Sequence, residues 1–121
     1  MNVHSAVDTL DEVLAEALKV LPEPVMLCDD DHILFANEAA QRLLGGSRAA
    51  EVESAPCKDF FDPEYADVNV EQHGYVLHNL VKFTDFPLKV HTLDGQILRL
   101  RVDMRPVSFD GMTVVMVTLA R

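Results

Sequence analysis

The chain has 121 residues, 49% of them hydrophobic and 25% charged, which suits one domain that buries roughly two-thirds of its unfolded surface. No apolar run approaches the roughly 20 residues needed to span a bilayer, which argues against a membrane protein. The formal net charge of −10 argues against binding to nucleic acid or anionic lipid, because an acidic surface repels phosphate groups.

Residues 1–21 are dominated by a predicted amphipathic helix over residues 5–21. Apolar side chains recur there every three or four residues, and two prolines follow the helix. The apolar stripe is narrow and close to a heptad repeat. Two interpretations stay open, in which the helix either covers its own sheet or forms the seam of a homodimer. The seam would consist of Val7, Leu10, Leu14 and Leu18, with Val114 and Met116 from the last strand.

Two short strands are expected next, at residues 25–28 and 32–36, followed by a helix over residues 38–44. Asn37 occupies the position of a helix N-cap, where its side-chain oxygen accepts a hydrogen bond from an early backbone N–H. Gly45 is expected to cap the other end of this helix, because glycine readily takes the left-handed conformation.

The middle of the chain is less regular. Residues 47–70 show no clear periodicity, and short helical turns are expected at residues 48–52 and 58–61. Residues 75–83 share an apolar face at helical spacing, so a helix is predicted there, with its start left open back to residue 70.

The last third of the chain is predicted to be a three-stranded antiparallel meander. Apolar and polar residues alternate most regularly over residues 98–105, and residues 88–91 and 112–119 supply the flanking strands. Asp-Gly pairs, which favour tight hairpin turns, lie between the strands. Residues 112–119 are apolar on both faces, so this strand is expected to be central and covered on both sides. Four residues are assigned structural roles in caps and turns: Asn37, Gly45, Gly95 and Gly111.

The order of these elements resembles the PAS fold. The resemblance covers residues 21–121 and rests on the Asn-Glu-Ala-Ala sequence at residues 37–40, the two strands before it and the two Asp-Gly turns. Asp31 departs from the pattern, since many relatives have glycine there. The resemblance implies an α+β fold with a five-stranded antiparallel sheet and short helices on one face. Residues 22–121 would form this PAS domain, and the amphipathic helix would precede it.

The resemblance also implies a role in bacterial signal transduction rather than catalysis. PAS domains sense small molecules, light or redox state, or mediate dimerisation. They serve histidine kinases of two-component systems, nucleotide cyclases or transcription factors. The chain ends directly after its last strand, which favours a fragment of a longer protein or a stand-alone adaptor. We expect a homodimer whose effector domain lies outside this chain.

A small-ligand pocket is expected between the helices and the sheet, although the same side chains also suit an ordinary core. Haem is a secondary candidate cofactor, because haem-binding relatives use a histidine on the helix before the meander. His73 falls on the apolar face of that helix and His78 on its polar side. The candidate lining residues are Phe35, Phe60, His73, Leu77, Leu80, Leu98, Leu100 and Val102.

Flavin is not expected, because Cys57 lacks the Asn, Arg and Gln neighbours of the light-oxygen-voltage flavin motif. The chain carries no recognisable metal spacing, catalytic triad or phosphate loop, so no enzyme is predicted. The alternative of a small α+β enzyme requires a polar pocket residue with a perturbed pKa. Cys28 and Cys57, in a chain without an export signal, are typical of reduced thiols in the cytoplasm, although one disulfide stays compatible.

Overall fold

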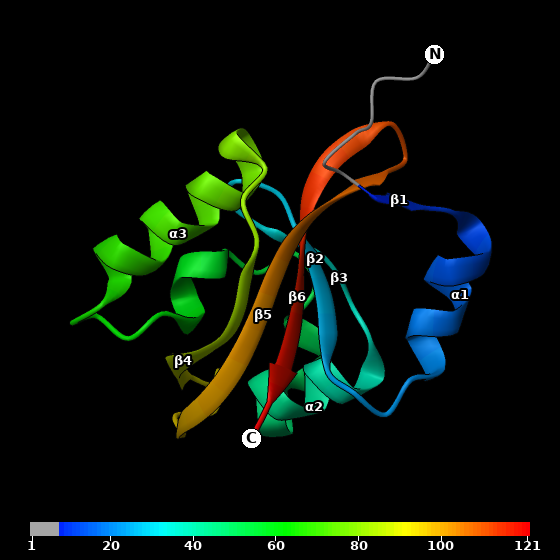
Figure 1. The fold of residues 1–121 in the computed structure, drawn as a ribbon. Coiled ribbons are helices and arrows are strands. Elements are labelled where there is room, and N and C mark those ends of the chain that lie inside the picture. The colour runs from blue at the N-terminus through cyan, green and yellow to red at the C-terminus, as the bar shows by residue number, and fades with distance from the viewer. Residues whose placement is uncertain (1–7) are drawn as a thin grey trace, which may run out of the picture.

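A five-stranded antiparallel sheet forms the centre of the molecule, and a short sixth strand joins it in parallel (Figure 1). The computed structural model describes residues 8–121. The predicted α+β architecture is confirmed. In chain order the elements are β1 (Asp8–Leu10), α1 (Glu12–Val20), β2 (Val25–Cys28), β3 (Ile33–Ala36), α2 (Glu38–Gly45), η1 (Gly46–Glu51), η2 (Cys57–Phe60), α3 (Ala66–Asn79), β4 (Phe83–His91), β5 (Ile97–Phe109) and β6 (Met112–Ala120).

Strand β6 lies at the centre of the sheet, between β5 and β2. Strand β3 pairs with β2 at one edge, and β4 pairs with β5 at the other. Val115 and Val117 are buried on one face of β6 and Val114 on the other, because neighbouring residues of a strand face opposite sides. The prediction that the last strand is central and covered on both faces is therefore confirmed.

The hairpin between β5 and β6 has the predicted two-residue turn. Phe109 pairs with Met112, which leaves Asp110 and Gly111 as the connection. Their φ angles are 55° and 79°. Positive φ at both central residues matches the twist of paired strands, and Asp-Gly is a preferred sequence for such turns. Gly95, in the turn between β4 and β5, also has a positive φ of 93°.

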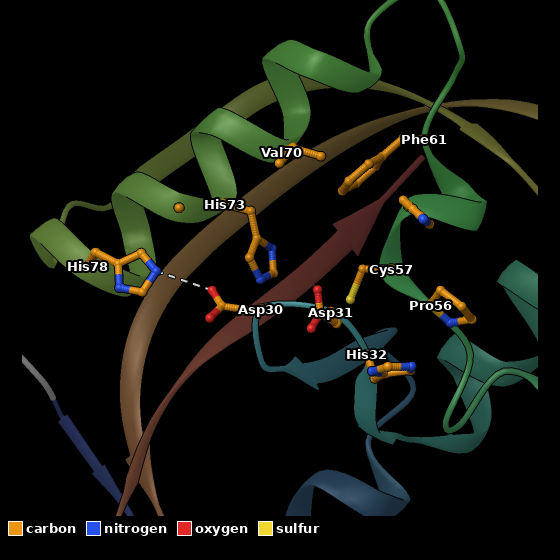
Figure 2. Close-up of a pocket in the computed structure, with 11 residues that line it drawn as sticks. Asp30, Asp31, His32, Pro56, Cys57, Phe61, Val70, His73 and His78 are labelled. Carbon is orange, nitrogen blue, oxygen red and sulfur yellow. Dashed lines mark hydrogen bonds and ion pairs between the residues drawn. The ribbon is translucent and has the colours of Figure 1, made fainter.

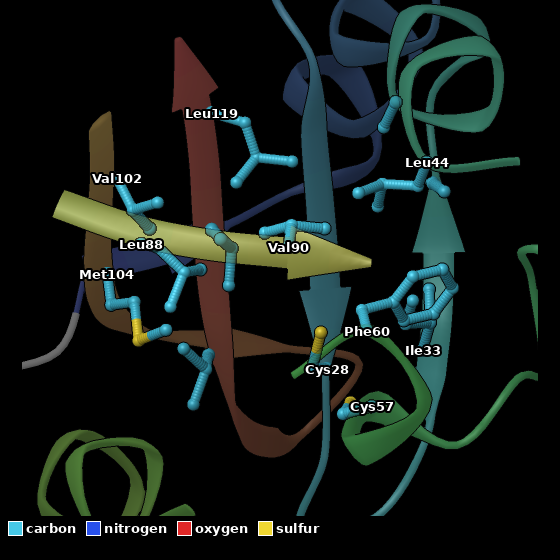
Figure 3. Close-up of a cluster of buried hydrophobic side chains, with 14 of the residues drawn as sticks. Cys28, Ile33, Leu44, Cys57, Phe60, Leu88, Val90, Val102, Met104 and Leu119 are labelled. Carbon is cyan, nitrogen blue, oxygen red and sulfur yellow. The ribbon is translucent and has the colours of Figure 1, made fainter. Parts of the chain in front are cut away.

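The two faces of the sheet carry separate hydrophobic clusters. The larger one, here called the inner core, lies between the sheet and the helices α2, η2 and α3, and Figure 3 shows part of it. The smaller one, the outer cluster, is centred on Leu27, Val107 and Val114. Leu18 of α1 packs against the outer cluster. Figure 1 shows α1 and α3 on opposite sides of the strands.

The N-terminal helix is shorter than predicted. It begins at Glu12 instead of residue 5, because the side chain of Asp11 caps it by accepting from the Leu14 N–H at 2.9 Å. The preceding residues, Asp8–Leu10, form β1 and pair with the last residues of β5. That end of β5 is open to a partner because β4 pairs with β5 only as far as Met104. The predicted position of Val7 lies outside the described residues.

The prediction for the helix before the meander is also corrected. Helix α3 spans Ala66–Asn79 rather than residues 75–83, so residues 66–70 are helical. Leu80 takes the left-handed conformation, with φ 57°, and ends the helix. Strand β4 then begins at Phe83, where pairing with Met104 outweighs the helical spacing of the side chains. The short turns η1 and η2 fall where the sequence indicates them.

Asn37 ties three segments together at the start of α2. Its Oδ1 accepts from the backbone N–H groups of Ala40 at 2.9 Å and Val25 at 3.1 Å. Its Nδ2 donates to the carbonyls of Leu18 and Glu23. The side chain therefore caps α2, and it also links the end of α1 to the first antiparallel strand.

The end of α2 differs from the prediction by one residue. Gly46, with φ 56°, is the C-cap, whereas Gly45 is still helical. Gly45 is needed for another reason, since a Cβ there would lie 2.9 Å from Cγ2 of Val52. Close packing of η1 on α2 therefore explains this glycine.

Candidate ligand pocket

A pocket of about 520 Å³ opens between the β2–β3 turn, η2 and α3 (Figure 2). Its volume falls in the range of small-molecule sites, roughly 300–1,000 Å³. We call it the histidine pocket, because three histidines line it. The lining residues are Asp30, Asp31, His32, Pro56, Cys57, Lys58, Phe61, Val70, His73, Gly74 and His78.

His73 is the buried polar side chain of this pocket. It is 5% exposed, and Figure 2 shows its ring pointing from α3 toward the β2–β3 turn. Its Nε2 lies 2.7 Å from the carbonyl oxygen of Asp29. A carbonyl only accepts, so Nε2 carries the hydrogen and donates it. The bond therefore fastens the middle of α3 to the end of β2.

The β2–β3 turn is held by its own acidic residue. Oδ1 of Asp29 accepts from the backbone N–H groups of Asp31 at 2.8 Å and His32 at 2.7 Å. Partial desolvation acts to raise the pKa of Asp29, but these backbone hydrogen bonds outweigh it and the pKa is lowered. The turn therefore presents a fixed, charged rim to the pocket.

His78 lies one turn further along α3, at the mouth of the pocket. Its Nε2 is 3.2 Å from Oδ1 of Asp30, and both side chains are more than half exposed. An exposed pair of this kind contributes little to stability. It nevertheless gives α3 a second link to the β2–β3 turn.

Two free thiols lie between the pocket and the inner core. Cys57 is 8% exposed and lines the pocket, whereas Cys28 is 1% exposed and lies behind it. Figure 3 shows the two side chains next to each other. A hydrogen bond with the Cys57 thiol, together with burial, raises the pKa of Cys28 well above its usual range. Cys28 therefore stays protonated and unreactive at neutral pH.

The residues predicted to line a pocket are distributed over four environments. His73 alone lines the histidine pocket. Phe60, Leu100 and Val102 belong to the inner core. Leu77 and Leu98 pack against that core. Leu80 is 37% exposed at the end of α3, and Phe35 packs on the opposite face of the sheet, in the outer cluster.

Sequence reasoning missed most of the histidine pocket. The three consecutive acids of the β2–β3 turn indicate a solvated loop by themselves, and only the fold brings α3 against them. Pro56 and Phe61 come from a segment without periodicity. One sequence signal does indicate this pocket, because His73 falls on the apolar face of its helix.

The dimerisation residues are also divided between burial and exposure. Val114 is fully buried and Met116 half-buried within the single chain. Leu18 is half-buried against the outer cluster, and Leu14 is 49% exposed. Leu10 lies in β1 rather than in the helix.

The α3 histidines do not fit a haem ligand as they stand. Nε2 of His73 is engaged with the Asp29 carbonyl, and Nε2 of His78 with Asp30. Iron ligation through Nε2 of His73 therefore requires the bond that holds α3 to the turn to break. Within residues 8–121, no group of three or more His, Cys, Asp or Glu side chains is arranged to hold a metal ion. Haem binding stays a prediction, which an absorption spectrum of the purified protein would test.

None of the helices described in residues 8–121 combines the length and apolar character needed to cross a bilayer.

No curated protein matches the chain.

Solved structures with the same fold are numerous but distant in sequence. The PAS domain of nitrogen regulation protein NR(II) from Vibrio parahaemolyticus is 19% identical, with a TM-score of 0.66, over 92% of this chain and 99% of that chain. A PAS domain from a two-component sensor histidine kinase is 14% identical, with a TM-score of 0.68, over 89% of this chain and 92% of that chain. These likenesses establish the fold.

A third structure is the PAS domain, in complex with ethanol, of a LuxR-family transcriptional regulator from Burkholderia thailandensis. It is 14% identical, with a TM-score of 0.67, over 90% of this chain and 96% of that chain. A sequence model described as PAS domain matches residues 22–120, nearly the whole chain after the N-terminal helix. The chain therefore belongs to the PAS domain family.

Proposed function

We propose that this chain is the regulatory module of a signalling protein, without catalytic activity of its own, whose effector domain lies outside the chain. Its generic sensory role follows from the family. The effector would be a histidine kinase or a transcription regulator, because similar domains come from a two-component sensor histidine kinase and a LuxR-family regulator. We further propose that it acts in the bacterial cytoplasm as a homodimer and responds to a small molecule.

The contact between His73 and Asp29 is the observation that carries the sensory proposal. A buried imidazole donates to the Asp29 carbonyl, directly after β2, at the wall of a ligand-sized pocket. A small molecule with a hydroxyl or carbonyl oxygen competes for that donor. Binding would loosen α3 from the end of β2, and β2 pairs directly with the central strand β6. A local exchange of hydrogen bonds would thus reach the strand that ends the domain.

Amide and side-chain NMR during titration with ethanol and glycerol tests this proposal. We expect saturable shifts at Cys57, His73 and the β2–β3 turn. His73→Phe keeps a ring but removes the donor, so it should abolish the saturation. His78→Phe is the matched control, because His78 is exposed at the mouth, and it should keep the response. Non-saturable shifts, or an unchanged response in His73→Phe, would contradict the proposal.

The dimer proposal rests on the exposed stripe of α1, defined as Val13, Leu14, Ala17 and Val20. None of the residues of α1 is buried, and Val13 and Val20 are 76% and 82% exposed. These two residues are seven apart, so they lie on one side of the helix. Leu18 faces the outer cluster instead. The seam that we propose therefore keeps Leu14 and replaces the predicted Leu10 and Leu18 with Val13, Ala17 and Val20.

A second copy of the chain is the partner that this stripe suits. The stripe has heptad-like spacing, and a twofold axis lets the same patch serve both subunits. It is also continuous through Leu18 with the outer cluster, so pairing would extend an existing apolar surface.

Sedimentation of the intact chain at tens of micromolar measures the assembly. We expect a dimer that Val13→Glu with Val20→Glu converts to a monomer. Lys19→Glu adds the same charge on the polar side of α1 and should leave the dimer intact. A monomeric wild type, or a dimer that survives the double substitution, would show that the seam is elsewhere.

A further inference from the structure

Two cysteines that lie far apart in the sequence meet at the inner wall of the histidine pocket. Cys28 is the last residue of β2, and Cys57 is the first residue of η2. Both thiols are free, and they share a hydrogen bond. Figure 3 shows the two side chains next to each other beside the inner core. Neither thiol takes part in the contact between His73 and Asp29.

The backbone holds both cysteines in place. Cys28 pairs with Val115 of the central strand β6. The N–H of Cys57 donates to the carbonyl oxygen of Asp31 at 2.8 Å, and Pro56 forms a bridge with His32 just before it. The contact between the two thiols therefore belongs to the junction of η2 with the β2–β3 turn, and it does not depend on a chance encounter of mobile segments.

The two thiols differ in their access to solvent. Cys57 is 8% exposed and lines the histidine pocket, and Figure 2 shows its side chain among those that surround the opening. Cys28 is 1% exposed and is not among the lining residues. A small oxidant that enters the pocket therefore reaches Cys57 first. An accessible thiol with a second thiol beside it is the arrangement of a redox-active cysteine and its resolving partner.

Burial gives Cys28 the second role. The hydrogen bond with Cys57, together with burial, raises the pKa of Cys28, so its thiol stays protonated and does not attack a dissolved oxidant. A protonated thiol still completes a disulfide, because its proton departs with the hydroxyl group of an oxidised neighbour. The product is uncharged, which suits a site next to the inner core.

We propose that Cys57 is an oxidation site for a small hydroperoxide and that Cys28 converts the oxidised Cys57 to a reversible disulfide. The Cys57 sulfur attacks the terminal peroxide oxygen. A sulfur–oxygen bond forms, the oxygen–oxygen bond breaks, and the thiol proton leaves with the alcohol, or with water when the oxidant is hydrogen peroxide. The Cys28 sulfur then displaces the hydroxyl group of the Cys57 sulfenic acid, which takes the Cys28 proton and leaves as water. The two sulfurs lose two electrons, and the peroxide gains them.

The disulfide joins the end of β2 to the start of η2 and removes a thiol from the pocket wall. Exchange with a small dithiol reverses it. The redox site stands whether or not the histidine pocket also binds a ligand, because the pocket serves only as the path to Cys57.

Alkylation followed by intact-mass measurement tests the proposal on the full chain. The chain is treated with hydrogen peroxide or tert-butyl hydroperoxide and then unfolded in urea with an alkylating reagent. We expect both thiols to be lost to the reagent together, in a monomer that has lost two hydrogen atoms, and dithiothreitol should restore both. Methionine oxidation adds oxygen but leaves the number of alkylated thiols unchanged. Two alkylated thiols after peroxide, loss of one thiol alone, or a disulfide-linked dimer would overturn the proposal.

Single substitutions separate the two roles. In Cys28→Val, oxidation of Cys57 should stop at the sulfenic acid, which dimedone traps. In Cys57→Val, Cys28 should be oxidised at least about ten-fold more slowly than Cys57 is in Cys28→Val, because it is buried and protonated. Valine is close to cysteine in size, and the melting temperature of each variant shows whether the fold is intact. The wild-type measurement stands if a variant does not fold. Equal oxidation rates in the two variants, or no dimedone adduct in Cys28→Val, would contradict the assigned roles.

Discussion

The two faces of the sheet differ in how completely the chain covers them. On the inner face, α2, η2 and α3 enclose a core in which Ile33, Leu44 and Val102 are at most 1% exposed. On the outer face, α1 contributes no buried residue, and Val13 and Val20 stay largely exposed. The difference indicates that inner-face packing holds the fold together, whereas the chain covers the outer face only in part.

The same leucine-to-alanine substitution, made once on each face, should show the difference between the faces most strongly. Leu44→Ala removes a side chain that is 1% exposed, and it should lower the free energy of unfolding by about 2–5 kcal/mol. Leu14→Ala removes the same atoms from a position that is 49% exposed, and it should cost less than about 1 kcal/mol. Urea unfolding at low protein concentration measures both. Similar losses would mean that α1 packs as tightly as the inner core.

Asn37 connects the two faces, and its loss is expected to have the next largest effect. An ordinary N-cap is worth about 1 kcal/mol. Asn37 also satisfies the N–H of Val25 and the carbonyls of Leu18 and Glu23, and it is only 2% exposed. Because buried groups lose their partners as well, Asn37→Ala should cost about 3 kcal/mol.

The matched control is Asp11→Ala, which removes the exposed N-cap of α1. It should cost about 0.5–1 kcal/mol. Hydrogen exchange adds a second measurement, since Asn37→Ala should increase exchange throughout α1 by freeing its last turn. If the two substitutions cost the same, Asn37 acts only as a cap and does not connect the faces.

The sequence predicts well those elements whose signals are local. The β5–β6 hairpin depends on strict alternation and on Asp110-Gly111, and α2 depends on Asn37 immediately before an apolar helical run. Local propensity and tertiary packing agree at these places. The central position of β6 also follows from composition, because only a strand covered on both faces can be apolar on both.

Prediction fails where a long-range contact decides the structure. Residues 8–10 extend the sheet only because the end of β5 has an open edge, and nothing in their own sequence indicates this. The start of α3 is obscured because its exposed face includes Val68 and Val70. The histidine pocket depends on the contact of His73 with a turn 44 positions earlier. Periodicity carries no information on such pairs.

Acid should weaken the β4 edge of the sheet through Asp62. This carboxylate is 5% exposed and accepts from Nε2 of His91 at 2.8 Å, and Nζ of Lys89 is 3.3 Å away. The hydrogen bond from His91 lowers the pKa of Asp62, burial opposes the shift, and the N–H of Glu64 and Lys89 add to it. A lowered native pKa means stability that is present above about pH 4, the ordinary carboxyl range, and lost as pH falls through the native value.

Unfolding measured from pH 7 to pH 3 checks this sign. Asp62→Asn should be less stable than wild type at pH 7, and its acid limb should be flatter. Asp59→Asn changes a nearby exposed acid and should leave the acid limb unchanged. A limb that is equally steep in Asp62→Asn would assign the acid sensitivity to other carboxylates.

The smallest effect on stability is expected at Val20, the most exposed of the large apolar residues of α1. Val20 is 82% exposed, so Val20→Ser should change the free energy of unfolding of the dilute monomer by less than about 0.5 kcal/mol. Val114→Ser is the matched substitution on the same face, and it should be far more costly because Val114 is fully buried.

Concentration turns this small effect into a test of the open outer face. A partner that binds only the native state raises the melting temperature as protein concentration rises. Wild type should therefore show a concentration-dependent melting temperature, which Val20→Ser should flatten without changing the value at high dilution. If Val20→Ser instead lowers the free energy of unfolding of the dilute monomer by about 1 kcal/mol or more, α1 is already packed in the monomer and the outer face is closed. An unchanged concentration dependence would leave the face open but move the dimer seam away from the exposed stripe.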